Sequence, residues 1–210
     1  MNDVMKLLLT LVIGYLLGSI STGVILSRVF GHKDIRNQGS GNSGTTNMLR
    51  VMGKKFALLT FAGDLLKGII AVLIGKALLG TQAGEIVGAF GAILGHNFPL
   101  YFGFKGGKAV AVTAGIGLYM DWRLFLICIG IYLLAFLIKK TASIASLSGV
   151  TFMPITMLIL GGFSASQYVV AIAAVAFVWI MHWPNLVRLA HHEEKAFAVK
   201  KAENAAKTEK

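Results

Sequence analysis

The sequence contains few charged residues, and acidic residues are especially scarce. Only 14% of its 210 residues are Asp, Glu, Lys or Arg, while 56% are hydrophobic. Soluble domains are about 25% charged and 45–50% apolar. A soluble or disordered chain is therefore excluded, because so much apolar surface could not be buried or solvated. Since a membrane-spanning helix needs about 20 apolar residues, we expect an all-α, polytopic membrane helical bundle.

Cysteine is scarce too. Cys128 is the only cysteine and lies within an apolar run, so the sequence offers neither a disulfide framework nor a cysteine-based metal site. The first 27 residues combine Asp3, Lys6 and a long apolar stretch with no small-residue cleavage site. A cleavable signal peptide would show the opposite features, so we expect a retained membrane helix.

Familiar hydrolase motifs are also missing. None of the five histidines is followed five residues later by Asp, and the sequence contains no G-x-S-x-G elbow and no Walker A motif. A nucleophilic serine in an α/β-hydrolase or a P-loop nucleotide site would need these patterns. The sequence therefore argues against a hydrolase that works through a covalent serine.

Lysine and arginine outnumber acidic residues 20 to 9, for a formal net charge of +11. In a membrane chain the positive-inside rule and anionic lipids explain this excess, so we expect no nucleic-acid partner. With seven transmembrane helices, an outside N-terminus and a cytoplasmic C-terminus, the inner segments carry 16 of the 20 basic residues. Segments 110–120 and 150–160 are short, so five full spans with two re-entrant segments remain the alternative. We expect one membrane domain, 1–196, and a basic cytoplasmic tail, 197–210.

Four polar segments fall on the predicted cytoplasmic side, and the first runs from 34 to 50. It is rich in Gly, Ser, Thr and Asn and holds Arg36 and Arg50. Glycines let backbone N–H groups converge on an anion, and guanidinium groups bind phosphate through paired hydrogen bonds. A plain connecting loop is the alternative, but it would not need this concentration of hydrogen-bonding side chains.

The second and third segments are shorter. Residues 105–108 read Lys-Gly-Gly-Lys and follow His96 in the chain, which predicts either a second anion site or an ordinary basic turn. Ser143 and Ser146 are three residues apart, so both can face one side of a helical turn. They predict either ligand contacts or a helix cap.

The fourth segment carries His182, Asn185 and Arg188 at helical spacing and continues to Glu194. Its histidines, including the pair 191–192, lack the ligand spacing of known zinc motifs, so we expect no metal. Asp64 and Lys67 lie three residues apart inside an apolar segment. Unpaired charge is costly in lipid, so these two pair with each other or face a polar cavity.

Together these segments resemble the bacterial acyl-phosphate:glycerol-3-phosphate acyltransferase family, integral membrane enzymes of the PlsY type. The resemblance covers residues 4–194 and is carried by these strings: Gly18-Ser-Ile, Asp34-Ile-Arg-x-x-Gly-Ser-Gly-Asn-x-Gly-x-Thr-Asn-x-x-Arg50, Asp64-x-x-Lys67-Gly68, Gly95-His96-x-x-Pro99, Phe104-x-Gly-Gly-Lys108, Ser143-x-x-Ser146-Leu147 and His182-x-x-Asn185-x-x-Arg188-Leu189. The chain departs from the family at Ser21, Thr45 and Ala109, where Pro, Ala and Gly are usual. The family tends to read Gly-x-Glu near Glu194, so the choice between Glu193 and Glu194 stays open.

The resemblance implies transfer of a fatty acyl group from acyl-phosphate to the sn-1 hydroxyl of glycerol 3-phosphate. The products are lysophosphatidic acid and inorganic phosphate, in phospholipid biosynthesis at the cytoplasmic face of the bacterial inner membrane. No cofactor is implied, and one chain should suffice for the mechanism. Phosphate is a good leaving group, so catalysis could rest on positioning and electrostatics.

The residues expected to serve this chemistry fall into three groups. The catalytic group is Ser40, Arg50, Lys108, His182 and Asn185. The substrate-binding group is Asn42, Thr46, Asn47, His96, Gly106, Gly107, Ser143, Ser146 and Glu194, and Asp64 and Lys67 form the intramembrane pair. Either His182 or the donor's phosphate could take the hydroxyl proton, and either serine could touch substrate.

Two other functions remain open from the sequence. A transporter or channel for a phosphorylated solute would also use polar glycine loops and an intramembrane charge pair. Against it, the polar loops gather on one side and no internal repeat divides the chain. A regulator that binds anionic lipid through its tail would leave the first polar segment unexplained.

Overall fold

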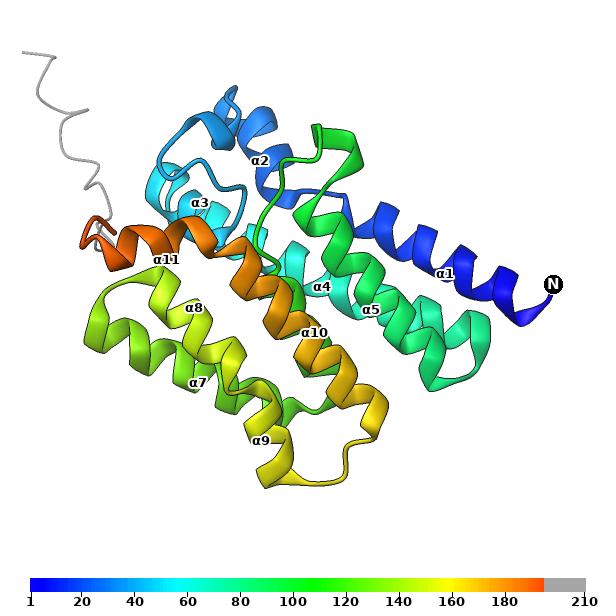
Figure 1. Ribbon diagram of the computed structural model, residues 1–210. Helices are drawn as coiled ribbons and strands as arrows, with labels where there is room; N and C mark the ends of the chain where they lie inside the picture. Colours follow the sequence, from blue (N-terminus) through cyan, green and yellow to red (C-terminus); the bar gives the residue numbers. More distant parts are fainter. Residues whose placement is uncertain (195–210) are drawn as a thin grey trace, which may run out of the picture.

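The chain folds into a bundle of apolar α-helices, shown in Figure 1. The computed structural model describes residues 1–194, and that part contains no strand. In chain order the elements are α1 (Asp3–Gly18), α2 (Thr22–Gly31), the 3₁₀ turn η1 (Ile35–Asn37), α3 (Thr45–Met52), α4 (Lys54–Leu79), α5 (Gln82–Asn97), the 3₁₀ turn η2 (Leu100–Phe102), α6 (Val110–Met120), α7 (Trp122–Lys139), α8 (Ala142–Thr151), α9 (Met153–Leu160), α10 (Ala165–Met181) and α11 (Trp183–Ala190). The expected all-helical fold class is confirmed.

Four stretches of helix are long and apolar enough to cross a membrane. They are Asp3–Gly31, Lys54–Leu79, Trp122–Lys139 and Ala142–Leu160, and α10 with α11 makes a fifth if this pair, bent by 56°, counts as one span. The segment 110–120 is short, as predicted. The prediction for 150–160 was wrong, because the helix already begins at Ala142 and includes the serine cluster as buried helical turns.

The first span is broken between α1 and α2, and the Asp64–Lys67 pair lies at the break. Lys67 Nζ donates to the backbone oxygen of Ile20 at 2.8 Å and contacts Asp64 Oδ1 at 2.9 Å. Both side chains are at most 5% exposed. A broken helix leaves carbonyl groups without partners, which is costly where water is absent. Lys67 therefore gives the Ile20 carbonyl at the helix break a hydrogen-bond donor, and Asp64 balances the charge of Lys67.

Small residues let the central helices approach closely. A Cβ added at Gly18 of α1 would lie 2.4 Å from the backbone oxygen of Ala92 on α5, and one at Gly75 of α4 would lie 2.0 Å from that of Gly84. Membrane helices use such small-residue contacts because lipid provides no hydrophobic drive to pair them. Helices α1, α4 and α5 thus form a tight core on which the other helices rest.

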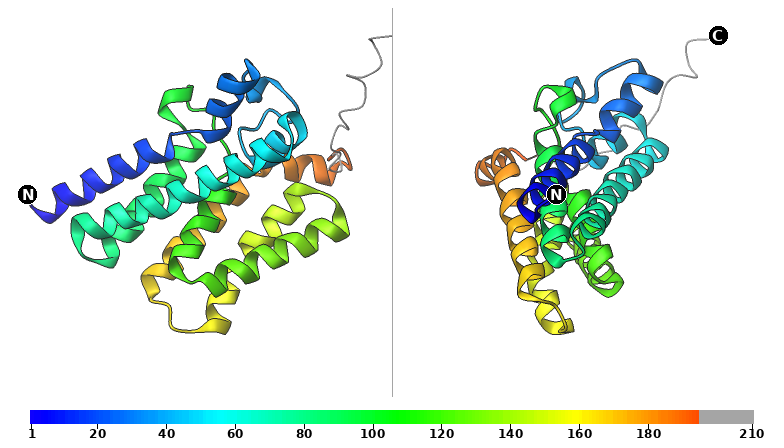
Figure 2. Two further views of the ribbon diagram at one scale, coloured as in Figure 1. Left: turned by 180° about the vertical axis from the view of Figure 1, so that it is seen from behind. Right: turned by 90° about the vertical axis from the view of Figure 1, so that its right-hand side faces the viewer.

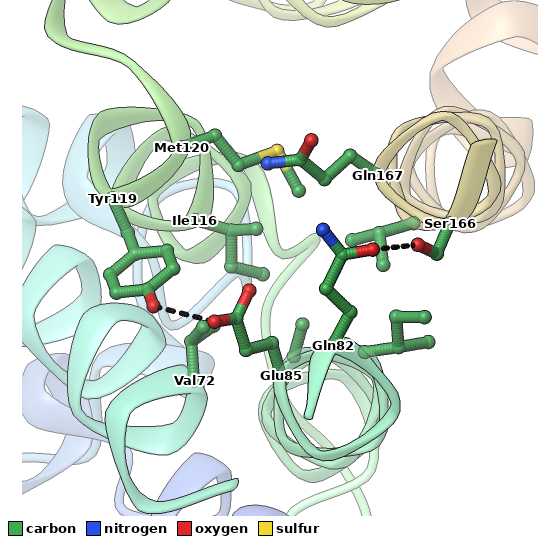
Figure 3. A pocket seen from close by; sticks show the side chains of 11 residues that line it. Val72, Gln82, Glu85, Ile116, Tyr119, Met120, Ser166 and Gln167 are labelled. Carbon is green, nitrogen blue, oxygen red and sulfur yellow. Dashed lines mark hydrogen bonds between the residues drawn. The ribbon is translucent and has the colours of Figure 1, made fainter. Parts of the chain in front are cut away.

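The polar segments gather at one end of the bundle. Figures 1 and 2 show α2, α3, the α5–α6 connection and α11 at this end, whereas the N-terminus and the α4–α5 and α9–α10 turns lie at the other. At that opposite end, Tyr119 donates to Glu85 at 3.0 Å and Ser166 to Gln82 at 2.7 Å, as Figure 3 shows. The space between these side chains is about 10 Å³, which is room for one water at most.

Candidate active site

A cavity of about 930 Å³ lies beneath the polar end, among α3, α4, α6, α7, α8 and α11. This volume is in the upper range for small-molecule sites. Among the residues predicted from the sequence, Arg36, Gly106, Gly107 and Lys67 do not line it. The others all do: Ser40, Asn42, Thr46, Asn47, Arg50, Asp64, His96, Lys108, Ser143, Ser146, His182, Asn185 and Glu194.

Asn47 holds the first polar segment in shape. Its Nδ2 donates to the backbone oxygens of Ile35, Gln38 and Asn42 at 2.8–3.1 Å, and its Oδ1 accepts from the Ser40 N–H at 2.8 Å. The side chain is 1% exposed. Although Asn47 borders the cavity, the loop uses both ends of its amide, so it positions Ser40 instead of offering a donor to a ligand.

The two arginines of the first segment have different surroundings. Arg36 binds Asp34 and also donates to the backbone oxygens of Phe102 and Lys105, at 2.5 and 3.0 Å. The hydrogen bonds from Arg36 hold the pKa of Asp34 well below its usual range. Arg36 therefore ties the first polar segment to the second, whereas Arg50 on α3 lines the cavity. The expectation that both arginines face the ligand was wrong, because Arg36 is used by the fold.

The second segment packs over His96. A Cβ at Gly107 would lie 2.1 Å from His96 Nε2, and a Cβ at Gly106 would lie 2.0 Å from the His96 backbone oxygen. Only glycine permits this approach, so the glycines place the loop and do not line the cavity. Lys108 is the cavity residue of this loop, and burial lowers its pKa to about 8.

Five side chains from distant segments form one hydrogen-bond network on the cavity wall. Lys108 Nζ donates to Asn185 Oδ1, and Asn185 Nδ2 donates to Glu194 Oε1 at 2.6 Å. Ser143 Oγ donates to the same carboxylate oxygen at 2.9 Å, and Arg188 Nε donates to Glu194 Oε2 at 2.7 Å. The network joins α8, α11 and the Lys108 loop around one carboxylate.

Glu194, and not Glu193, is the acid of this network. Glu193 is exposed, whereas Glu194 accepts three side-chain hydrogen bonds. Partial burial raises the pKa of Glu194, but the hydrogen bonds from Asn185, Arg188 and Ser143 outweigh it and hold the pKa below its usual range. The carboxylate is therefore ionised at neutral pH.

His182 lies at the bend between α10 and α11 and is 2% exposed. Its Nδ1 is 2.8 Å from the backbone oxygen of Val178. A carbonyl oxygen only accepts, so Nδ1 carries the proton. In the neutral ring Nε2 then has a free lone pair, which can accept a hydrogen bond or a proton from a hydroxyl group.

Three buried polar atoms on the cavity wall lack a hydrogen-bond partner within residues 1–194. They are His96 Nδ1, Thr45 Oγ1 and Thr113 Oγ1. His96 Nδ1 is 3.7 Å from Asp64 Oδ1, which is too long for a hydrogen bond. Buried polar atoms in proteins nearly always have partners, so these three atoms are exceptions at the cavity wall. No sequence signal singled out Thr113, which lies in an otherwise apolar helix.

The rest of the cavity wall is apolar. We name the part between α6, α7 and the α8–α9 helix the apolar limb; its wall includes Val110, Ala114, Gly117, Leu124, Phe125, Cys128, Ile129, Val150 and Met153. The cationic groups Lys54, Arg50, Lys108 and Arg188 lie on the polar side. One cavity therefore joins a cationic end, suited to phosphate, with an apolar limb, suited to a hydrocarbon chain.

Metal-ligand geometry is absent from the described part of the chain. No group of three or more His, Cys, Asp or Glu side chains in residues 1–194 is placed to hold a metal ion.

Known proteins are similar to this chain in sequence. The model of the family described as glycerol-3-phosphate acyltransferase matches residues 8–192. A glycerol-3-phosphate acyltransferase of Streptococcus thermophilus is 39% identical over 197 residues, which is 90% of this chain and 92% of that protein. One of Pseudomonas putida is 42% identical over 187 residues, or 88% and 96% of the two chains.

A solved structure extends the similarity to the fold. The crystal structure of PlsY, an integral membrane glycerol 3-phosphate acyltransferase, in its glycerol 3-phosphate form matches with a TM-score of 0.84. The two chains are 34% identical, and the match covers 91% of this chain and 96% of PlsY. The chain therefore belongs to the glycerol-3-phosphate acyltransferase family.

Proposed function

We propose that the protein transfers a fatty acyl group from acyl-phosphate to the sn-1 hydroxyl of glycerol 3-phosphate. The products are lysophosphatidic acid and inorganic phosphate, at the start of phospholipid synthesis. The observation that carries the proposal is the single cavity with a cationic end and an apolar limb. A second PlsY structure, 31% identical, is in a lysophosphatidic acid form, a molecule with both of these parts.

The phosphate groups of both substrates need fixed positive charge. Arg50 and Lys108 supply it from two separate polar segments, and Ser40 lines the same cavity from the loop that Asn47 holds. Asn42, Thr46 and Ser146 add polar groups to the same end of the cavity. Preorganised donors of this kind stabilise both a leaving phosphate and a developing oxyanion.

The acceptor hydroxyl is held by the other side of the site. Asn185 and Glu194 orient it, and His182 Nε2 lies on the same wall with a free lone pair. The hydroxyl oxygen attacks the acyl carbonyl carbon, the carbon–oxygen bond to phosphate breaks, and phosphate leaves with the bonding electrons. The hydroxyl proton passes to one of two bases, His182 Nε2 or the donor's phosphate. No covalent serine is needed, because positioning the two substrates removes most of the entropic barrier.

The proposal includes a topology. Seven helical passes, with the N-terminus outside and the C-terminus in the cytoplasm of a bacterium, put the polar end at the cytoplasmic face of the inner membrane. The gathering of basic residues at that end supports this orientation. The described lining residues all come from one chain, which supports a monomeric mechanism. Residues 1–196 form the catalytic domain, and the basic tail 197–210, suited to anionic lipid, lies outside the described residues.

A transporter of a phosphorylated solute is the second candidate. It would need a path to the opposite end of the bundle, where Tyr119, Glu85, Gln82 and Ser166 link α5, α6 and α10 around about 10 Å³. A closed far end and a large cavity at the polar end favour the transferase.

The first test is phosphate release by purified, detergent-solubilised protein given palmitoyl phosphate, with and without glycerol 3-phosphate. Release that requires the acceptor, with lysophosphatidic acid formed in step, is the expected result. Release without acceptor would identify a hydrolase, and no release from folded protein would favour transport. The Arg50→Ala variant should lose turnover across a glycerol 3-phosphate titration, while Arg123→Ala, exposed at the other end, should not.

A further inference from the structure

We infer that Gly117, Leu124 and Met153 form the closed end of the apolar limb and set the length of acyl chain that the protein accepts. The inference rests on the proposed function, because it assigns the apolar limb to the acyl chain.

The limb runs deep into the bundle along one face of each helix. On α6 the wall residues Val110, Ala114 and Gly117 are four and three residues apart, which is the spacing of one helix face. On α8–α9 the wall extends from Ser143, which contacts Glu194, to Met153. At ~1.5 Å per helical residue this is a depth of ~15 Å. The limb therefore leads from the charged network toward the far side of the membrane.

The closed end is a packed hydrophobic cluster. Leu124 is 0% and Met153 is 3% exposed, and both pack with Met157 and Ala171 behind them. These side chains occupy the space into which a longer chain would have to extend. Shortening one of them should deepen the limb, since a buried side chain that is truncated leaves a cavity.

Gly117 is buried and faces the Met153 side chain. A Cβ added there would meet only the terminal methyl carbon of Met153, at 3.5 Å, which is an ordinary van der Waals contact. Because Gly117 lines the cavity, a larger side chain would extend into the limb without displacing backbone. The absence of a side chain at this position thus keeps the deepest part of the limb free.

The same helices offer a matched control. Gly130 on α7 also sits in regular helix, and a Cβ there would have no atom within 4 Å. It does not line the cavity. Gly130→Leu adds the same side chain as Gly117→Leu, but outside the limb. Both variants therefore change helix propensity and side-chain size in the same way, and only Gly117→Leu changes the limb.

The test measures kcat/KM for a series from octanoyl to stearoyl phosphate in the wild type, Gly117→Leu, Met153→Ala and Gly130→Leu. The ratio of palmitoyl to decanoyl phosphate should fall at least ~10-fold in Gly117→Leu, since displacing methylenes from an apolar pocket costs about this much. The ratio of stearoyl to palmitoyl phosphate should rise in Met153→Ala. Gly130→Leu should match the wild type. A ratio that changes less than about twofold in Gly117→Leu, or an equal loss at all lengths, would overturn the inference.

A second readout needs no turnover. Cys128, the single cysteine, lies on the wall of the limb, so hexadecyl phosphate should slow its alkylation by N-ethylmaleimide in the wild type. In Gly117→Leu, decyl phosphate should protect better than hexadecyl phosphate. No protection by either ligand would place the chain outside the limb, past the exposed Leu133 into lipid. Equal protection by both ligands in Gly117→Leu would overturn the role of Gly117. If hexadecyl phosphate protects Cys128 in wild-type protein that makes no lysophosphatidic acid, the proposed function is refuted but the assignment of the limb to an alkyl chain stands.

Discussion

Ser143 on α8 donates a hydrogen bond to Glu194 at 2.9 Å, although the two residues are 51 positions apart in the chain. The same carboxylate oxygen accepts from Asn185, which in turn accepts from Lys108. One acidic side chain thus fixes the orientation of an amide and, through it, of a cation. Three of the four polar segments depend on this single carboxylate for their arrangement.

Glu194→Gln should reduce kcat/KM strongly. The amide removes the charge that Arg188 pairs with and leaves one acceptor oxygen where Oε1 serves Ser143 and Asn185 and Oε2 serves Arg188. Hydrogen bonds to charged groups contribute about 1.5–3 kcal/mol, so a loss of roughly 10- to 150-fold in lysophosphatidic acid formation is expected. Glu193→Gln is the control, because Glu193 is exposed. Equal activity of the two variants would refute the network's role.

Affinity for glycerol 3-phosphate should fall as the pH rises through about 8. Burial lowers the pKa of Lys108 to about 8, so the free protein loses this positive charge at a pH where ordinary lysines keep theirs. A bound phosphate dianion favours the protonated form, so binding weakens as the proton is lost. The apparent KM should rise above pH 8 in the wild type and stay flatter in Lys108→Arg. Parallel pH profiles in both proteins would contradict the assignment.

Lys67→Met should destabilise the protein. It leaves Asp64 buried without its partner and the backbone oxygen of Ile20 without its donor. Breaking a buried ion pair by removing one partner costs about 3–5 kcal/mol. Thermal unfolding in detergent should show a clear drop in Tm. Lys76→Met, whose side chain is 59% exposed, should change stability by at most about 1 kcal/mol, and a similar drop there would contradict the structural role of Lys67.

Gly107→Ala should reduce both activity and stability. The new methyl group would lie 2.1 Å from His96 Nε2, so either the imidazole or the Lys108 loop must move. Overpacking of this kind typically costs about 1–3 kcal/mol. Gly130→Ala has open space and should be neutral or stabilising by up to about 1 kcal/mol. Comparing Tm and the KM for glycerol 3-phosphate in the two variants tests whether the glycine is needed for packing against His96.

The sequence predicted the helical bundle well, because long apolar runs have few alternatives. Its boundaries failed where polar residues belong to a helix. The apolar segment was expected at 150–160, yet α8 begins at Ala142 and includes Ser143 and Ser146. A buried hydroxyl group is tolerated in a helix once it has a partner, as Ser143 has in Glu194. The break between α1 and α2 was likewise not assigned to Lys67, because the donor lies 47 residues away.

Within the site, residue type was informative but not sufficient. Nearly every predicted polar residue lines the cavity, because in a membrane chain polar side chains have few other places to lie. Asn47 and Arg36 donate hydrogen bonds to backbone oxygens of the protein. The sequence alone does not distinguish a side chain that donates to a loop from one that donates to a ligand. The apolar limb escaped prediction since an apolar position facing lipid resembles one facing a cavity.

The position of Glu194 also bears on how the protein is made. Glu194 follows α10, so the carboxylate that organises Lys108, Asn185 and Ser143 is synthesised only after every helix that contributes to the bundle. Chains emerge from the ribosome N-terminus first, and until then Ser143 and Asn185 lack the carboxylate to which both donate. A nascent chain therefore holds no assembled site. The hydrogen-bond network around Glu194 therefore forms only after α11 has been synthesised.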